Sequence, residues 1–153
     1  MIMRKIILTI LMSVLGFIEI NAQTVSRTIL KSGTWEWTSP KCNYATTKMH
    51  FNETTRYWDV YYFYNKETNT DIDKYYLSDT LPTTFDKSKV GKVASGKYIV
   101  MLSETTYNGE KIEDMLCYKV LNVTNDELRV EDCYISPDTV GGIGEIYVFK
   151  KVK

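Results

Sequence analysis

The side chains of this sequence with the most reactive chemistry are three cysteines, Cys42, Cys117 and Cys133. Two thiols can join as a disulfide or contribute to a metal site, and a single thiolate can act as a nucleophile. If the chain is exported, one disulfide is expected, and the remaining thiol is better explained as a small buried side chain than as a nucleophile. The pairing stays open, because Cys42 could join either of the other two.

One histidine and several carboxylates complete the set of candidates for chemistry. His50 lies in a strand-like run with no second ligand beside it, so no metal site is expected. No spacing among the carboxylates selects two of them as an acid–base pair, and solvated strand faces explain them better. We therefore predict no catalytic site and no cofactor. The carboxylates considered are Glu36, Asp59, Asp71, Asp73, Glu113 and Asp114.

The N-terminal residues have the pattern of a secretory signal. Arg4 and Lys5 precede an apolar run over residues 6–18, and Ala22 supplies a small residue at a cleavage position. The apolar run is shorter than a helix that spans a membrane requires. We predict a signal peptide over residues 1–22, a mature domain over residues 23–153, and export to the periplasm or the extracellular medium. An uncleaved anchor is the alternative.

Charge and composition exclude some partners. The net charge is zero and the two signs are interspersed, so no basic stripe favours nucleic acid. No polybasic amphipathic helix is present to hold the mature domain on a membrane. The twelve tyrosines favour strands and also suit binding surfaces.

The cysteines, the histidine and the carboxylates discussed above lie on or between a succession of predicted strands. About eight runs alternate apolar with polar residues or are apolar throughout, and turn residues separate them. Residues 23–31 are expected to form a loose polar lead-in, and no convincing helix is found. We predict an all-β fold, a single antiparallel up-and-down barrel of about eight strands with little or no helix. The predicted strands cover residues 33–38, 46–51, 56–64, 72–78, 96–102, 112–123, 127–134 and 145–152.

The clearest local prediction is a hairpin over residues 115–134, whose turn is formed by residues 124–127. The predicted pairs are Val123 with Leu128, Leu121 with Val130, and Lys119 with Asp132. In this register Cys117 faces Tyr134, and Cys133 points to the other face of the sheet. A shift of one residue would be needed to bring the two cysteines opposite each other.

Two short motifs carry a resemblance to a known family. Gly33-Thr34-Trp35 resembles the Gly-x-Trp opening of lipocalins, and residues 121–130 resemble the late hairpin of lipocalin-like domains in secreted proteins of Bacteroidetes-type bacteria. The resemblance implies a calycin-type barrel in which Gly33 and Trp35 are structural and Trp35 closes the barrel floor. It also implies an arginine packed over that tryptophan, and Arg129 is the candidate. Lipocalins usually carry a helix after the barrel, whereas the last element predicted here is a strand.

Five aromatic residues could line an apolar interior and orient a ligand through their polar atoms. They are Trp58, Tyr62, Tyr64, Tyr75 and Tyr98. The alternative is an interior filled by its own side chains, as small eight-stranded barrels often are.

The predicted barrel and its aromatic residues are compatible with two functions. The first is a secreted or periplasmic, non-enzymatic, lipocalin-like protein that binds a small hydrophobic ligand. The second is a protein-binding module, such as an inhibitor of a co-secreted peptidase. In the second case the long connection from Asp79 to Ser95, with Phe85 and Val90 as its apolar anchors, would meet the protein partner.

Overall fold

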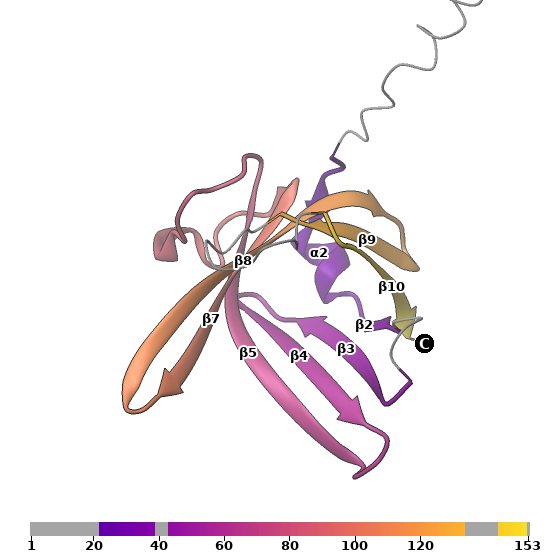
Figure 1. Ribbon diagram of the computed structural model, residues 1–153. Coiled ribbons are helices and arrows are strands. Elements are labelled where there is room, and N and C mark those ends of the chain that lie inside the picture. Colours follow the sequence, from indigo (N-terminus) through magenta and orange to yellow (C-terminus); the bar gives the residue numbers. More distant parts are fainter. Residues whose placement is uncertain (1–21, 39–42, 134–143, 153) are drawn as a thin grey trace, which may run out of the picture.

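A closed barrel of eight antiparallel strands forms the centre of the computed structural model, which describes residues 22–38, 43–133 and 144–152 (Figure 1). Each barrel strand pairs with the next along the chain, and the last closes against the first, so the predicted up-and-down barrel is confirmed. The barrel strands are β2 (Thr34–Trp37), β3 (Ala45–Phe51), β4 (Thr55–Tyr62), β5 (Glu67–Ser78), β7 (Tyr98–Tyr107), β8 (Glu110–Val123), β9 (Glu127–Asp132) and β10 (Ile146–Val152). The other elements are β1 (Val25–Ser26), α2 (Arg27–Lys31), η1 (Lys87–Lys89) and β6 (Ser95–Gly96).

Alternation along the strands builds the barrel core. In β3 every second residue from Ala45 to Phe51 is buried and the residues between are half-buried, as a period of two requires. The same alternation on the other strands turns large apolar side chains inward, where they form one cluster. That cluster includes Trp35, Met49, Tyr75, Leu77, Ile99, Met101, Tyr118, Val120, Leu128, Val130 and Phe149.

The lead-in segment covers one end of the barrel, which we call the capped end. Val25 and Leu30 are completely buried in the core cluster, and the Trp35 Nε1 donates to the Leu30 carbonyl at 3.0 Å. β1 pairs with β6, which ties the segment to the wall. The prediction of a loose lead-in is therefore wrong. Val25 and Leu30 stand in a largely polar segment of the sequence, and they are buried only because the folded barrel supplies their surroundings.

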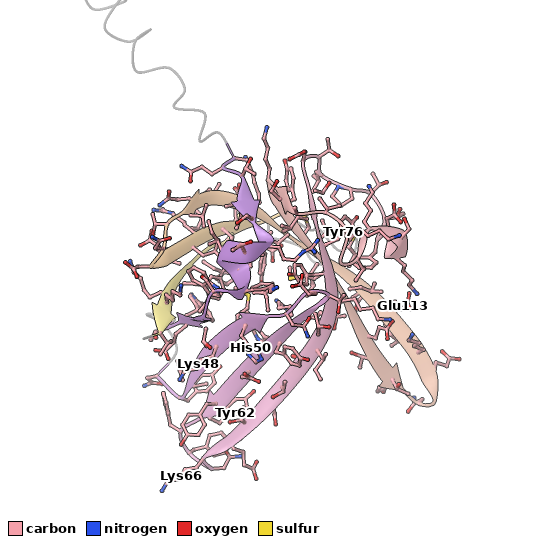
Figure 2. All side chains as sticks on the ribbon, turned by 180° about the vertical axis from the view of Figure 1, so that it is seen from behind. Lys48, His50, Tyr62, Lys66, Tyr76 and Glu113 are labelled. Carbon is pink, nitrogen blue, oxygen red and sulfur yellow. The ribbon has the colours of Figure 1, made fainter. Side chains whose placement is uncertain are left out.

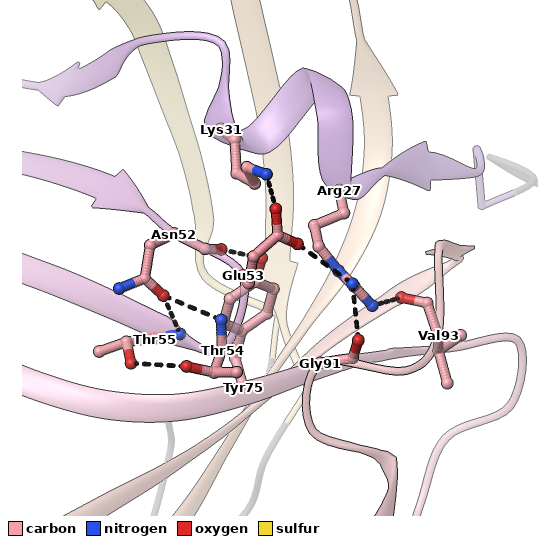
Figure 3. A network of polar contacts seen from close by, with 9 residues as sticks. All are labelled: Arg27, Lys31, Asn52, Glu53, Thr54, Thr55, Tyr75, Gly91 and Val93. Carbon is pink, nitrogen blue, oxygen red and sulfur yellow. Dashed lines mark hydrogen bonds and ion pairs between the residues drawn. The ribbon is translucent and has the colours of Figure 1, made fainter.

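Polar contacts hold the cap in place (Figure 3). Arg27 of α2 donates to the carbonyl oxygens of Gly91, at 2.8 Å, and of Val93, and its Nη1 lies 3.3 Å from a Glu53 carboxylate oxygen. Lys31 pairs with the same carboxylate. These contacts join the short helix to the β3–β4 turn and to the long connection before β6.

The cation packed over Trp35 is Lys151. Its Nζ lies 5.7 Å from the centre of the Trp35 ring and donates to Ser32 Oγ at 2.8 Å. Arg129, the predicted candidate, is exposed on β9 and lies opposite Asn122, so that prediction is wrong. β10 pairs directly with β2 and brings Lys151 opposite Trp35, a contact between the two ends of the chain that a local motif does not show.

The other end of the barrel is spread apart, and we call it the divergent end. β5 and β7 pair only between Lys74–Ser78 and Tyr98–Leu102, and beyond those residues the β4–β5 and β7–β8 arms separate (Figure 1). Residues 67–70 and 103–107 belong to these strands, although turns were predicted there. Apart from the half-buried Ser103, these residues are exposed, so they lack the apolar alternation by which strands are recognised.

The connection from Asp79 to Ser95 packs on the outside of the barrel. Phe85 and Val90, its predicted anchors, contact a second apolar cluster of Tyr76, Val100 and Cys117. The centres of the Phe85 and Tyr76 rings are 5.1 Å apart. Figure 2 shows Tyr76 near this connection, far from Tyr62 and Lys66 toward the tip of the β4–β5 arm.

A β-bulge changes the register of the β8–β9 hairpin. Val123 lies opposite Leu128 as predicted, but after the bulge Val120 pairs with Val130. The predicted pairs Leu121–Val130 and Lys119–Asp132 are therefore wrong. One extra residue on β8 causes the shift, and it lets Val120 face inward while its backbone bonds to other segments. Those bonds run from Val120 N to the Lys97 carbonyl and from Gln23 N to the Val120 carbonyl, each 2.9 Å.

The bulge also overturns the prediction for two of the cysteines. Beyond Tyr118, which pairs with Asp132, the next positions are Cys117 and Cys133, and Cys133 N donates to the Cys117 carbonyl at 3.0 Å. The two residues are cross-strand neighbours rather than on opposite faces. Cys42 lies outside the described residues, as does nearly all of the predicted signal peptide. In the described part of the chain, no helix has the length and apolar character needed to cross a membrane.

Candidate ligand-binding site

The structure divides the five predicted ligand-binding residues among four places. Trp58 and Tyr62 face inward on β4, half-buried, and Tyr75 faces inward at the capped end, buried, with its hydroxyl donating to the Asn52 carbonyl at 2.8 Å. Tyr64 follows β4 and is 77% exposed, with its ring centre 5.8 Å from that of Tyr62. Tyr98 lies on the outer wall in the second apolar cluster. Only Trp58 and Tyr62 therefore share the inward surface toward the divergent end.

Three further aromatic residues, which the sequence analysis missed, complete that inward surface. The ring of Tyr147 on β10 lies 5.2 Å from that of Trp37 and 5.8 Å from that of Tyr118. Trp58 meets Phe149 edge to face at 6.0 Å. Trp37 stands two residues after Trp35, and Tyr147 two residues before Phe149, so strand alternation places each on the same face as a buried aromatic neighbour. This spacing of two residues is the sequence signal that could have identified Trp37 and Tyr147 as inward-facing. We call Trp37, Trp58, Tyr62, Tyr118 and Tyr147 the inward aromatic surface.

A buried ion pair lies beside this surface. Arg56 Nε donates to Asp73 Oδ2 at 2.8 Å, and an Nη of the guanidinium bonds to the same oxygen. The Arg56 guanidinium also lies 4.9 Å from the centre of the Trp58 ring. Because Asp73 neutralises Arg56, the pair presents polar groups to the interior without adding net charge.

The hydroxyls of Tyr118 and Tyr147 on this surface stay protonated at neutral pH, because the pKa of each is raised. Burial raises the pKa of Tyr118, and the nearby Arg56 opposes that rise. Burial also raises the pKa of Tyr147, and so does the hydrogen bond that its hydroxyl donates to Glu145 at 3.0 Å. The surface therefore combines apolar ring faces with neutral hydroxyls, which suits an apolar molecule that carries a polar group.

His50 and three of the six carboxylates considered for chemistry, Glu36, Asp59 and Glu113, lie on outer strand faces, whereas Asp71, Asp73 and Asp114 lie on inward faces. His50 on β3 stacks on Tyr57 with ring centres 4.5 Å apart, and its Nδ1 lies 3.6 Å from Asp59 Oδ2. Figure 2 shows His50 and Lys48 on β3 and Glu113 on β8. Glu113 lies in ion pairs with Lys87 and Lys111, at 3.0 and 3.2 Å. No group of three His, Cys, Asp or Glu side chains suited to hold a metal ion occurs among the described residues.

Comparisons of the chain with models of protein families, with curated proteins and with solved structures found no match. The class of the protein is therefore defined by its own architecture, an eight-stranded antiparallel up-and-down barrel that is capped at one end and divergent at the other.

Proposed function

We propose that this protein is an exported, non-enzymatic, lipocalin-like carrier that binds a small hydrophobic ligand on the inward aromatic surface. The observation that carries this proposal is the uneven burial of large rings inside one barrel. At the capped end Trp35, Tyr75 and Phe149 are buried, whereas toward the divergent end Trp37, Trp58, Tyr62 and Tyr147 are only half-buried. Apolar surface left in contact with water on an inward face favours a ligand that covers it.

Contacts at the capped end support the lipocalin-like part of the proposal. Trp35 is buried beneath the lead-in helix, and Lys151 lies over its ring. The resemblance in the Gly33-Thr34-Trp35 motif implied both features, a floor closed by the tryptophan and a cation packed on it. Lysine takes the place of the implied arginine.

The chemistry of the surface favours a largely apolar ligand with one polar end. The rings of Trp58 and Tyr62 offer apolar contact, and the protonated hydroxyls of Tyr118 and Tyr147 offer hydrogen bonds. The Arg56–Asp73 pair is internally neutral, so it does not select for an anion. Fatty acids, haem and an environment-sensitive hydrophobic dye are suitable first probes.

Native mass spectrometry of the purified protein, followed by denaturing analysis, would reveal a ligand that leaves with the protein. Binding is then measured by quenching of tryptophan fluorescence on titration with the probes. Replacing Tyr62 by Ser should weaken binding roughly tenfold, because one ring of contact is lost. The matched control is Tyr61→Ser, since Tyr61 is the neighbouring residue of β4 and faces outward. Absence of binding across the panel, or equal loss in both variants, would overturn the proposal.

Protein binding through the connection from Asp79 to Ser95 is the second candidate function. Phe85 and Val90 hold this segment on the barrel wall, and Leu81 is its exposed large apolar residue, at 52%. A partner such as a co-secreted peptidase should then be recovered in a pull-down with the native chain and lost with Leu81→Asp. Equal recovery by both would count against this segment as the binding site.

A further inference from the structure

Cys117 and Cys133 lie next to each other on the outer wall of the barrel. The two residues are joined by a backbone hydrogen bond, and Cys133 Sγ also donates to the Cys117 carbonyl, at 3.1 Å. Hydrogen-bonded neighbours in antiparallel strands have Cα atoms about 5.5 Å apart, within the range that disulfides span. Both are free thiols in the structure.

The surroundings of the pair favour intramolecular bond formation. Cys117 is completely buried in the second apolar cluster, and Cys133 packs against that cluster while remaining partly exposed. An external reagent can therefore reach Cys133 more readily than Cys117. The β8–β9 bulge is essential to this arrangement, because without it the two side chains would point to opposite faces.

We propose that Cys117 and Cys133 form a reversible cross-strand disulfide by exchange with an external disulfide. The Cys133 thiolate attacks that disulfide, forms a mixed disulfide and releases one thiolate. Cys117 then loses its proton to solvent and attacks Cys133 Sγ, which expels the second thiolate. The two released thiolates take up protons, so two protein thiols are oxidised as the external disulfide is reduced to two thiols.

The local electrostatics agree with this order of events. Interaction with the Cys117 thiol lowers the pKa of Cys133, so the partly exposed sulfur is the one more readily ionised. The same interaction, together with burial, raises the pKa of Cys117. Once Cys133 is in the mixed disulfide, it carries no negative charge. Its interaction with Cys117 then no longer raises the Cys117 pKa, whereas burial still does.

The bond would fasten β8 to β9 on the outer wall, next to the connection that carries Phe85 and Val90. It closes a loop of about 15 residues, and restricting the unfolded chain in this way should raise the melting temperature by roughly 5–10 °C. This inference does not depend on the proposed ligand, since the pair lies on the outer face of the wall.

The test is peptide mapping of the wild-type protein after incubation with oxidised glutathione. Trypsin cleaves after Lys111, Lys119, Arg129 and Lys150, so the bond should link the peptide 112–119 to the peptide 130–150 until a reductant is added. A Cys42→Ser variant, which keeps only these two thiols, should lose two hydrogens in mass and melt at the higher temperature. Its Cys117→Ser derivative should instead keep a glutathione adduct on Cys133.

Two results would overturn the proposal. One is a linked peptide that joins Cys42 to either of the other cysteines in the wild-type protein. The other is a Cys42→Ser protein that keeps both thiols, or a stable glutathione adduct, under oxidation that forms disulfides in a control protein. Because the wild-type chain is mapped directly, a variant that folds poorly leaves the test intact.

Discussion

Arg56 on β4 and Asp73 on β5 form an ion pair inside the barrel, where their side chains are 4% and 1% exposed. The two residues lie directly opposite each other in the β4–β5 ladder, and Arg56 also packs on Trp58. The sequence analysis placed Asp73 among solvated carboxylates. Both side chains are almost completely shielded from water, so each buried charge is stabilised mainly by its partner, and removing one partner leaves the other charge uncompensated.

Breaking this pair should therefore be costly. Replacing Arg56 by Met or Asp73 by Asn is expected to lower the free energy of unfolding by about 3–5 kcal/mol, and the double variant should lose less than the sum. Urea unfolding of the four proteins measures the coupling. The control is the half-exposed pair of Lys48 and Glu36, 3.5 Å apart, whose loss should cost at most about 1 kcal/mol. Similar losses for both pairs would contradict burial of Arg56 and Asp73.

Gly96 is required by close approach of the backbone. A Cβ at this position would lie 2.5 Å from the Ser78 nitrogen, and backbone atoms cannot move aside easily. Gly96→Ala is expected to destabilise the protein by about 1–3 kcal/mol through overpacking. Gly33→Ala is the comparison, because its Cβ would meet only the flexible Lys151 side chain and should cost less. Thermal unfolding ranks the two variants, and the reverse order would contradict the fold at β6.

Lys151 should contribute to stability through Trp35. Lys151→Ala is expected to lower the free energy of unfolding by about 0.5–1 kcal/mol, while Lys151→Arg should largely preserve it. Arg129→Ala serves as the control, since Arg129 is exposed and should change stability by no more than about 0.5 kcal/mol. A larger loss from Arg129 than from Lys151 in urea unfolding would restore the assignment made from the sequence.

The lead-in segment should behave as part of the core. Leu30→Ala is expected to cost about 2–5 kcal/mol, because Leu30 is completely buried and its loss leaves a cavity beside Trp35. Thr28→Ala, on the same short helix but exposed, provides the reference. Chemical unfolding with tryptophan fluorescence reports both changes. Equal stability of the two variants would mean that the cap does not contribute to the barrel.

Alkaline pH should destabilise the fold through buried tyrosines. Burial raises the pKa of Tyr75 from 10.0 to about 12, so between these values the unfolded chain releases a proton that the folded protein keeps. The stabilising contribution is complete below pH 10 and is lost as pH rises toward 12. Tyr75→Phe should flatten this dependence in urea unfolding, although it also loses the bond to Asn52. An unchanged slope would show that Tyr75 does not titrate as described.

The sequence analysis located part of the candidate site. Trp58 and Tyr62 could be placed on one face of β4 from alternation alone, because neighbouring residues of a strand point to opposite sides. Which face turns inward depended on pairing with β3 and β5, and the joining of Trp37 with Tyr147 depended on closure of the barrel. Tyr98 was misplaced for the same reason, since its face of β7 lies beneath the long connection.

Local patterns by themselves determined the number of barrel strands, their order and the up-and-down barrel, because side-chain alternation and turn residues act over a few neighbouring positions. Tertiary structure alone decided the β8–β9 bulge, the burial of Leu30 and the place of Lys151 over Trp35. Each of these depends on contacts between distant segments. At the bulge, for example, the backbone of Val120 forms hydrogen bonds with Lys97 and Gln23. These two residues are distant in the sequence and lie beside Val120 only in the folded barrel.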